Sequence, residues 1–231
     1  MQFHLKKKEF TKFIGDMSKT KNIDADIIEK DYYVCAILKE ISKQQDYLKA
    51  YFKGGTAVYK ILDEMNRFSE DIDLTVKVVS EQSNTQNRKR LKLSALGYKI
   101  DGLELLKEEC IDNKGSVTAV YKYETAFKPD ERQLHRAGKI LVEATSFTIS
   151  EPTETYYIEP LVYKLANDSE KKILEEQFDV SKIKIEIITL ERMFIDKIFA
   201  AEFYYIRNMY MDASKHLYDI SILFNNARIQ R

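Results

Sequence analysis

Two aspartates separated by one residue offer the clearest chemistry in this 231-residue sequence. The alternating run from Asp71 to Val76 predicts a strand in which Asp71 and Asp73 share one face while Ile72 and Leu74 face a core. Neighbouring carboxylates repel each other, so a cation between them would stabilise the pair. Mg²⁺ prefers oxygen ligands and also binds substrate phosphates, which makes it the natural ion here. The alternative is an exposed strand with two hydrated aspartates.

A glycine pair precedes the two aspartates. The triplet Gly54-Gly55-Thr56 falls between a predicted short strand, Tyr47 to Phe52, and a predicted helix, Thr56 to Leu62. Glycines let a phosphate approach the backbone, and the free N–H groups at the start of a helix bind anions. Such a triplet alone is more often a simple turn. Because Arg67 and Ser69 follow closely, the segment predicts a triphosphate cradle beside the paired carboxylates.

Three further charged residues stand at positions that could matter for a site. Lys197 has apolar same-face neighbours on its predicted helix, a position from which a lysine side chain usually extends to water. Glu143 points away from the core-facing residues of the predicted strand Lys139 to Phe147, and could simply be exposed. Asp219 lies one helical turn from Lys215, with which it could form a surface ion pair.

The periodicity of apolar residues predicts the helices and strands that position these residues. The chain has only three prolines and seven glycines to interrupt them. Helices are predicted from Asp24 to Ile41, from Gln82 to Leu96 and beyond Leu190, a further strand from Val117 to Tyr123, and a polar loop from Phe127 to Arg136. The pattern predicts an α+β fold, with a small mixed sheet flanked by N-terminal and C-terminal helices. A boundary near Pro152 to Pro160 would separate residues 1–150 from a mainly helical part, residues 151–231, although this segment could also be a loop within one domain.

Composition limits the classes of protein that remain. Lysine plus arginine (37) equals aspartate plus glutamate (37), so a polyanionic partner would need a local basic patch. Cys35 and Cys110 are too few for a disulfide framework or a zinc site, which favours a reducing compartment. No stretch approaches the ~20 apolar residues of a membrane helix, and the N-terminus lacks a signal-peptide pattern. We therefore expect a soluble, unprocessed cytoplasmic protein with no membrane partner.

Several motifs together resemble the AbiEii/AbiGii-type toxin nucleotidyltransferases of the polymerase-β superfamily. The runs that carry this resemblance are Phe52-Lys53-Gly54-Gly55-Thr56-Ala57, Arg67-Phe68-Ser69-Glu70-Asp71-Ile72-Asp73-Leu74, Glu29-Lys30-Asp31-Tyr32-Tyr33, Leu190-Glu191-Arg192-Met193-Phe194-Ile195-Asp196-Lys197 and Lys215-His216-Leu217-Tyr218-Asp219-Ile220. The first two are similar to the first motif of that family, the third to its first helix, and the last two to its C-terminal motifs. The resemblance spans roughly Glu29 to Leu223.

This resemblance implies a polymerase-β-like core that moves a nucleoside monophosphate from an NTP to an acceptor hydroxyl. It implies Mg²⁺, or Mn²⁺, held by Asp71 and Asp73, with Glu143 as a third carboxylate that acts as general base or metal ligand. It further implies that Lys197 binds the nucleotide's phosphates and that Asp219 is a second active-site residue. The triphosphate would then be bound by Gly54, Gly55, Thr56, Arg67 and Ser69.

The resemblance also implies a biological role. It suggests the toxin of a toxin–antitoxin or phage-defence system, modifying an RNA such as tRNA and restrained by a cognate antitoxin. The basic run Arg88-Lys89-Arg90-Lys92 could contact an RNA backbone or be a solvated helix face. Two alternatives remain open: the same fold could modify a protein or a small molecule such as an antibiotic, or the chain could be a non-catalytic nucleotide-binding module.

Overall fold

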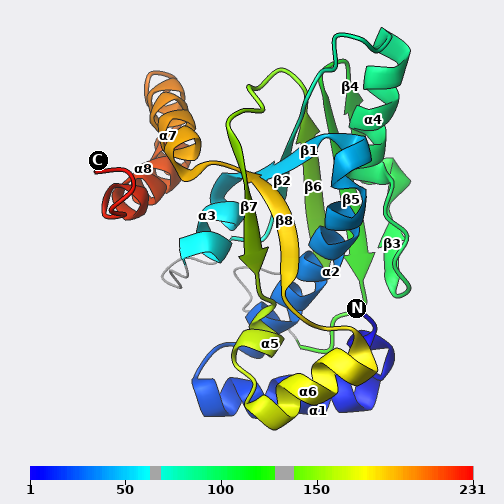
Figure 1. The fold of residues 1–231 in the computed structure, drawn as a ribbon. Coiled ribbons are helices and arrows are strands. Elements are labelled where there is room, and N and C mark those ends of the chain that lie inside the picture. Colours follow the sequence, from blue (N-terminus) through cyan, green and yellow to red (C-terminus); the bar gives the residue numbers. More distant parts are fainter. Residues whose placement is uncertain (63–68, 128–137, 231) are drawn as a thin grey trace.

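The computed structural model describes residues 1–62, 69–127 and 138–230. Within these residues, the strands form one mixed sheet in the order β3-β5-β6-β2-β1-β8-β7, and β4 pairs with β5 at one edge (Figure 1). The strand bounds are β1 Ala50–Lys53, β2 Ile72–Val76, β3 Leu103–Leu105, β4 Ile111–Asn113, β5 Ser116–Tyr123, β6 Lys139–Thr145, β7 Thr153–Ile158 and β8 Ile183–Ile188. The predicted α+β class with a mixed sheet is therefore confirmed.

Eight α-helices in the described residues surround this sheet. Their bounds are α1 Lys7–Lys21, α2 Ala25–Leu48, α3 Gly54–Leu62, α4 Asn84–Leu96, α5 Leu161–Lys164, α6 Asp168–Phe178, α7 Leu190–Tyr205 and α8 Tyr210–Phe224. Capping boxes at Ser83 and Asn167 satisfy free N–H groups at the starts of α4 and α6. The helices α7 and α8 pack against each other at the upper left of Figure 1, where α8 also contacts α3.

Each element predicted in the first part of the chain corresponds to an observed one with shifted ends, but α1, β3 and β4 were not predicted. The first predicted helix continues to Leu48, which is fully buried, so the strand expected from Tyr47 begins at Ala50 instead. Lys49 ends the helix in the left-handed conformation, with φ of 50°. Of the predicted polar loop, everything from residue 128 lies outside the described residues.

Two strands were missed in the second half of the sequence. The segments β7 and β8 pair with each other in antiparallel fashion, and β8 pairs in parallel with the central strand β1. The run from Ile183 to Ile188 does alternate, since Ile183, Ile185 and Ile187 are buried while Lys184 is exposed. This short period-two signal lies within residues 151–231, which were predicted to be mainly helical.

One face of the sheet forms the core beneath α2. The side chains of Phe52, Ile72, Leu74 and Val142 are fully buried there, on three neighbouring strands. Because side chains alternate along each strand, the residues between them must project from the opposite face. The pattern of the core therefore decides which polar residues are brought together on the other face of the sheet.

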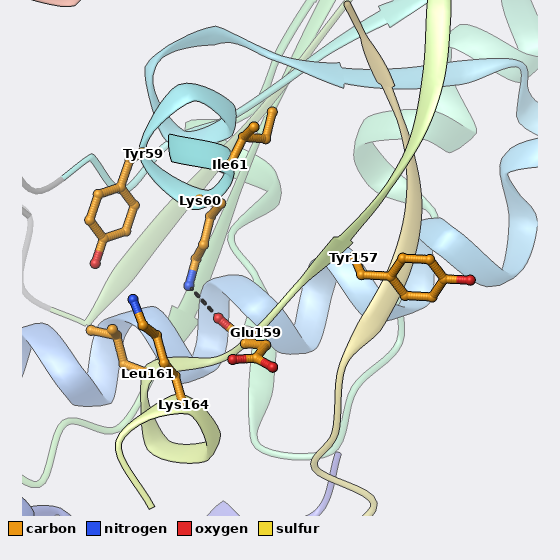
Figure 2. A pocket seen from close by; sticks show the side chains of 7 residues that line it. All are labelled: Tyr59, Lys60, Ile61, Tyr157, Glu159, Leu161 and Lys164. Atoms are coloured by element: carbon orange, nitrogen blue, oxygen red, sulfur yellow. Dashed lines mark hydrogen bonds between the residues drawn. The ribbon is translucent and has the colours of Figure 1, made fainter. Parts of the chain in front are cut away.

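A buried ion pair ties α2 to α3. The carboxylate of Asp31 pairs with Lys60 and accepts a hydrogen bond from the backbone N–H of Leu161 at 2.7 Å. Lys60 also donates to the backbone carbonyl of Glu159 at 3.1 Å, as Figure 2 shows. Both charged side chains are almost fully buried, with 1% of the Asp31 side chain and 4% of the Lys60 side chain exposed. Each therefore depends on the other for compensation of its charge.

Replacing Asp31 should destabilise the protein strongly. In Asp31→Ala, the Lys60 ammonium stays buried without its carboxylate and the Leu161 N–H loses its acceptor. We expect the free energy of unfolding to fall by about 3–5 kcal/mol in urea denaturation. As a control, Lys172→Ala removes an exposed ion pair with Glu176 and should change it by less than about 0.5 kcal/mol. Equal effects of the two variants would contradict this account.

Candidate active site

Three charged residues form a row across the middle of the sheet. Lys53 on β1 is the register partner of Asp73 on β2, and Asp73 is in turn the partner of Glu143 on β6. Register partners project from the same side of a sheet, so the three side chains lie next to one another on the face opposite the core. Asp71, two residues before Asp73, falls on the same side, and the burial alternation of the strand supports this placement.

Gly54 allows the Asp73 side chain to lie against the start of α3. Its φ of +85° is unfavourable for any residue with a side chain. A Cβ atom at this position would lie 2.7 Å from Cγ and 2.9 Å from Cβ of Asp73. The predicted strand-to-helix junction is therefore confirmed, and its first glycine is required by the close approach of the carboxylate as well as by the backbone.

The segment before β2 is fastened to α3. The hydroxyl of Thr56 donates to the backbone carbonyl of Asp71 at 2.5 Å and lies 2.9 Å from the hydroxyl of Ser69. Thr56 is buried, so its side chain supports the turn and leaves the contacts with any phosphate to the backbone of this junction. Arg67, which was predicted to bind the nucleotide, lies outside the described residues.

Lys197 and Asp219 form a buried ion pair between α7 and α8. Lys197 Nζ lies 2.7 Å from Asp219 Oδ2, and only 11% and 5% of the two side chains are exposed. The lysine therefore does not extend to water. Asp219 does not form the surface pair with Lys215 that its spacing allowed, because Lys215 pairs with Asp212. Both side chains therefore point into the protein interior and away from solvent.

The electrostatics of the site show an excess of negative charge around Asp73. Burial, and then the charge of Glu143, raise the pKa of Asp73 to about 7, against the opposing effect of Lys53 and Lys197. The pKa of Glu143 is also raised, first by loss of hydration beside the sheet and then by the like charge of Asp71, although Glu143 is exposed to solvent and is screened by it. These interactions place Lys197 close enough to the acidic row to act on it.

Lys53 is a candidate site residue that the sequence analysis did not single out. It shares the sheet face of Asp73, and its Nζ lies 3.5 Å from the hydroxyl of Thr148. Burial lowers its pKa, against the effect of Asp73. A signal was present in the sequence, because Lys53 immediately precedes Gly54 and alternates with the core residue Phe52.

The residues present fit a divalent cation. Among the described residues, no three Asp, Glu, His or Cys side chains are already gathered around one point. Mg²⁺ usually takes only one or two carboxylates and completes its shell with water and substrate phosphates. Asp71 and Asp73 can supply those carboxylates, and because burial and Glu143 raise the pKa of Asp73, a cation beside it would stabilise its ionised form.

A pocket of about 200 Å³ lies at the other end of α3. In Figure 2 the side chains of Lys60 and Lys164 reach into the same space, from α3 and α5. None of the predicted site residues lines this pocket, so it is separate from the acidic row. No helix in the described part of the chain is long and apolar enough to cross a membrane.

A mixed sheet that carries paired carboxylates beside a glycine turn is the arrangement expected of a nucleotidyltransferase core. The chain belongs to the family of AbiEii nucleotidyl transferase toxins of type IV toxin–antitoxin systems, whose model matches residues 36–231. A search of curated proteins gave no match.

Among solved structures, the fold is similar to that of MenT4, a nucleotidyltransferase toxin from Mycobacterium tuberculosis H37Rv. The TM-score is 0.53 at 14% sequence identity, and the match covers 81% of this chain. The chain spans 57% of the length of MenT4, so the likeness supports the fold of the shared part.

Adding a methyl group at Gly54 should disturb the site directly. Gly54→Ala forces the Asp73 carboxylate away and strains the backbone, at a cost of about 1–3 kcal/mol in unfolding free energy. The control is Gly15→Ala within α1, where the new Cβ meets only Phe127 at 3.9 Å. That variant should gain about 0.5–1 kcal/mol. Chemical denaturation of both measures the difference, and a neutral Gly54→Ala would show that the turn does not constrain Asp73.

The raised pKa of Asp73 predicts a pH-dependent cost of ionisation. The folded state holds the proton up to about pH 7 while the unfolded state releases it near pH 3.8, so this group reduces stability as pH rises between those values. At pH 8 without divalent cations, Asp73→Asn should be more stable than wild type by about 1–2 kcal/mol, a difference that shrinks towards pH 4.

The measurement is urea denaturation across this pH range. Mg²⁺ at pH 8 should stabilise the wild type more than Asp73→Asn, because only the wild type presents both aspartates to the ion. Wild-type stability that rises relative to the variant from pH 4 to pH 7 would contradict the environment assigned to Asp73.

Proposed function

We propose that this chain transfers a nucleoside monophosphate from an NTP to an acceptor hydroxyl, using Mg²⁺ or Mn²⁺. The observation that carries the proposal is the row of Lys53, Asp73 and Glu143 across three strands, with the charge of Lys197 acting on it. Asp71 and Asp73 would hold the ion. When bound, the ion neutralises phosphate charge and stabilises the entering and leaving oxygens.

The chain's own residues have separate tasks in this reaction. The acceptor oxygen forms a bond to the α-phosphorus, the bond to the β-phosphate oxygen breaks, and pyrophosphate leaves with the electron pair. Glu143, which lies beside Asp73, accepts the proton of the acceptor hydroxyl. Lys197 and Lys53 offset the charge of the phosphates, and Asp219 holds Lys197 in position. The backbone at Gly54, Gly55 and Thr56 binds the triphosphate at the start of α3, where Ser69 lies 2.9 Å from Thr56. Arg67, which lies outside the described residues, is proposed from its sequence position alone to add positive charge.

The site as proposed needs both parts of the chain. Residues 1–150 supply the acidic row and the glycine turn, and residues 151–231 supply Lys197 and Asp219. The pairing of β8 with β1 fixes the strand that leads into α7 next to the strand that carries Lys53. This connection supports an active site completed by the C-terminal helices.

We further infer that the acceptor is RNA, such as tRNA, and that a cognate antitoxin restrains the activity in the cytoplasm, in a system that could also serve phage defence. The family description supports the toxin–antitoxin setting. Both cysteines in the described residues are free, in keeping with a reducing compartment.

A labelling experiment tests the function. Purified protein is incubated with Mg²⁺, each labelled NTP in turn, and separate pools of total RNA, protein and small molecules. We expect label in the RNA pool, reduced about 100-fold or more in Asp71→Asn and Lys197→Met. Lys215→Met is the matched control, because this lysine is exposed on α8 and pairs with Asp212. Equal labelling by wild type and Asp71→Asn would refute the metal site, and label in another pool would reassign the acceptor.

A further inference from the structure

Three consecutive charged residues of α2 are buried. Glu29, Lys30 and Asp31 are 1%, 7% and 1% exposed. Such residues are almost never buried unless they are paired. Successive helical residues point about 100° apart, so the three side chains leave α2 in three directions and reach three different segments.

Two of these residues hold segments outside the acidic row. The Glu29 carboxylate accepts the backbone N–H groups of Ala126 at 2.8 Å and Phe127 at 3.4 Å, in the connection that follows β5. Asp31 pairs with Lys60 in α3, as described above. These contacts of Glu29 and Asp31 all lie outside residues 69–71, the described residues that lead into β2.

Lys30 is the residue that reaches the site segment. Its Nζ lies 2.5 Å from Oε2 of Glu70, and only 9% and 11% of the two side chains are exposed. Burial alternates from Glu70 to Leu74, with Glu70, Ile72 and Leu74 buried and the aspartates between them less so. Glu70 is therefore a charged member of the core-facing row, and Lys30 compensates its charge there.

The backbone next to Glu70 has a second attachment. The Thr56 hydroxyl donates to the carbonyl of Asp71, as described above, so α3 holds the backbone while α2 holds the side chain of the preceding residue. Two attachments on successive residues fix both the position and the rotation of the chain at Asp71. The direction of the Asp71 carboxylate depends on that rotation.

We propose that Lys30 and Glu70 are positioning residues that hold Asp71 in place for a divalent cation, an inference that rests on the proposed function. A buried ion pair is weak evidence of a need for stability, since uncharged residues of similar size often support a fold equally well. Groups that orient a metal ligand have a different effect, because their loss typically weakens metal binding 10–100-fold. Metal affinity in a folded variant therefore separates positioning from mere support.

The test replaces the pair by uncharged residues of similar size. Lys30→Met with Glu70→Gln removes both charges together, so that neither is left buried alone, and Glu70→Gln alone serves if the double variant does not fold. Glu29→Gln is the matched control: a neighbouring buried residue of the same helix whose carboxylate accepts hydrogen bonds from Ala126 and Phe127. Binding of Mn²⁺ alone is measured from the electron paramagnetic resonance signal of the free ion, at a temperature where circular dichroism shows each variant folded.

We expect the double variant to bind Mn²⁺ about tenfold more weakly than wild type, and Glu29→Gln to bind it as wild type does. Transfer should then need about tenfold more Mn²⁺ for its half-maximal rate, with little change at saturation. A folded double variant that binds Mn²⁺ as tightly as wild type overturns this inference and leaves the proposed function standing. Wild type that binds no Mn²⁺ overturns the proposed metal site and this inference together.

Discussion

The organisation of this protein depends on carboxylates that the sheet register brings together on one face. Asp73 and Glu143 are fixed as neighbours by the parallel pairing of β2 and β6, and burial together with their like charge makes the ionised state of Asp73 costly. Such an arrangement persists only if the rest of the fold stabilises it. Lys53 and Lys197 supply part of the required positive charge, and a bound cation with a nucleotide's phosphates would account for the remaining need.

The two faces of the sheet have complementary roles. Ile72 and Leu74 anchor β2 in the core beneath α2, and the same alternation turns Asp71 and Asp73 to the other face. The core therefore fixes the register on which the acidic row depends. Charged residues of α2 extend this control, since Lys30 pairs with Glu70 just before β2 and Asp31 pairs with Lys60 in α3. The same contacts therefore stabilise the fold and position the residues of the candidate site.

The C-terminal helices contribute a charge that the sheet lacks. Lys197 emerges from α7, is paired with Asp219 of α8, and acts on the pKa of Asp73. A lysine held by a buried carboxylate has already lost the freedom of its long side chain, so the proposed contact with phosphate would cost little further entropy. Membership of the AbiEii family, with a match that extends through these helices, agrees with a site assembled from both ends of the chain.

The sequence by itself determined the local features: the strand from Asp71, the glycine turn, the helical periods of α2 and α4, and the family. These depend on residue types at fixed short spacings, which a linear pattern records. Tertiary structure decided the partners. Lys53 joined the acidic row through strand register, Asp219 turned to Lys197 instead of Lys215, and β8 joined the sheet beside β1. Each of these depends on contacts between segments that are distant in the sequence. Spacing along the chain does not distinguish between the possible pairings, and burial and charge compensation determine which one forms.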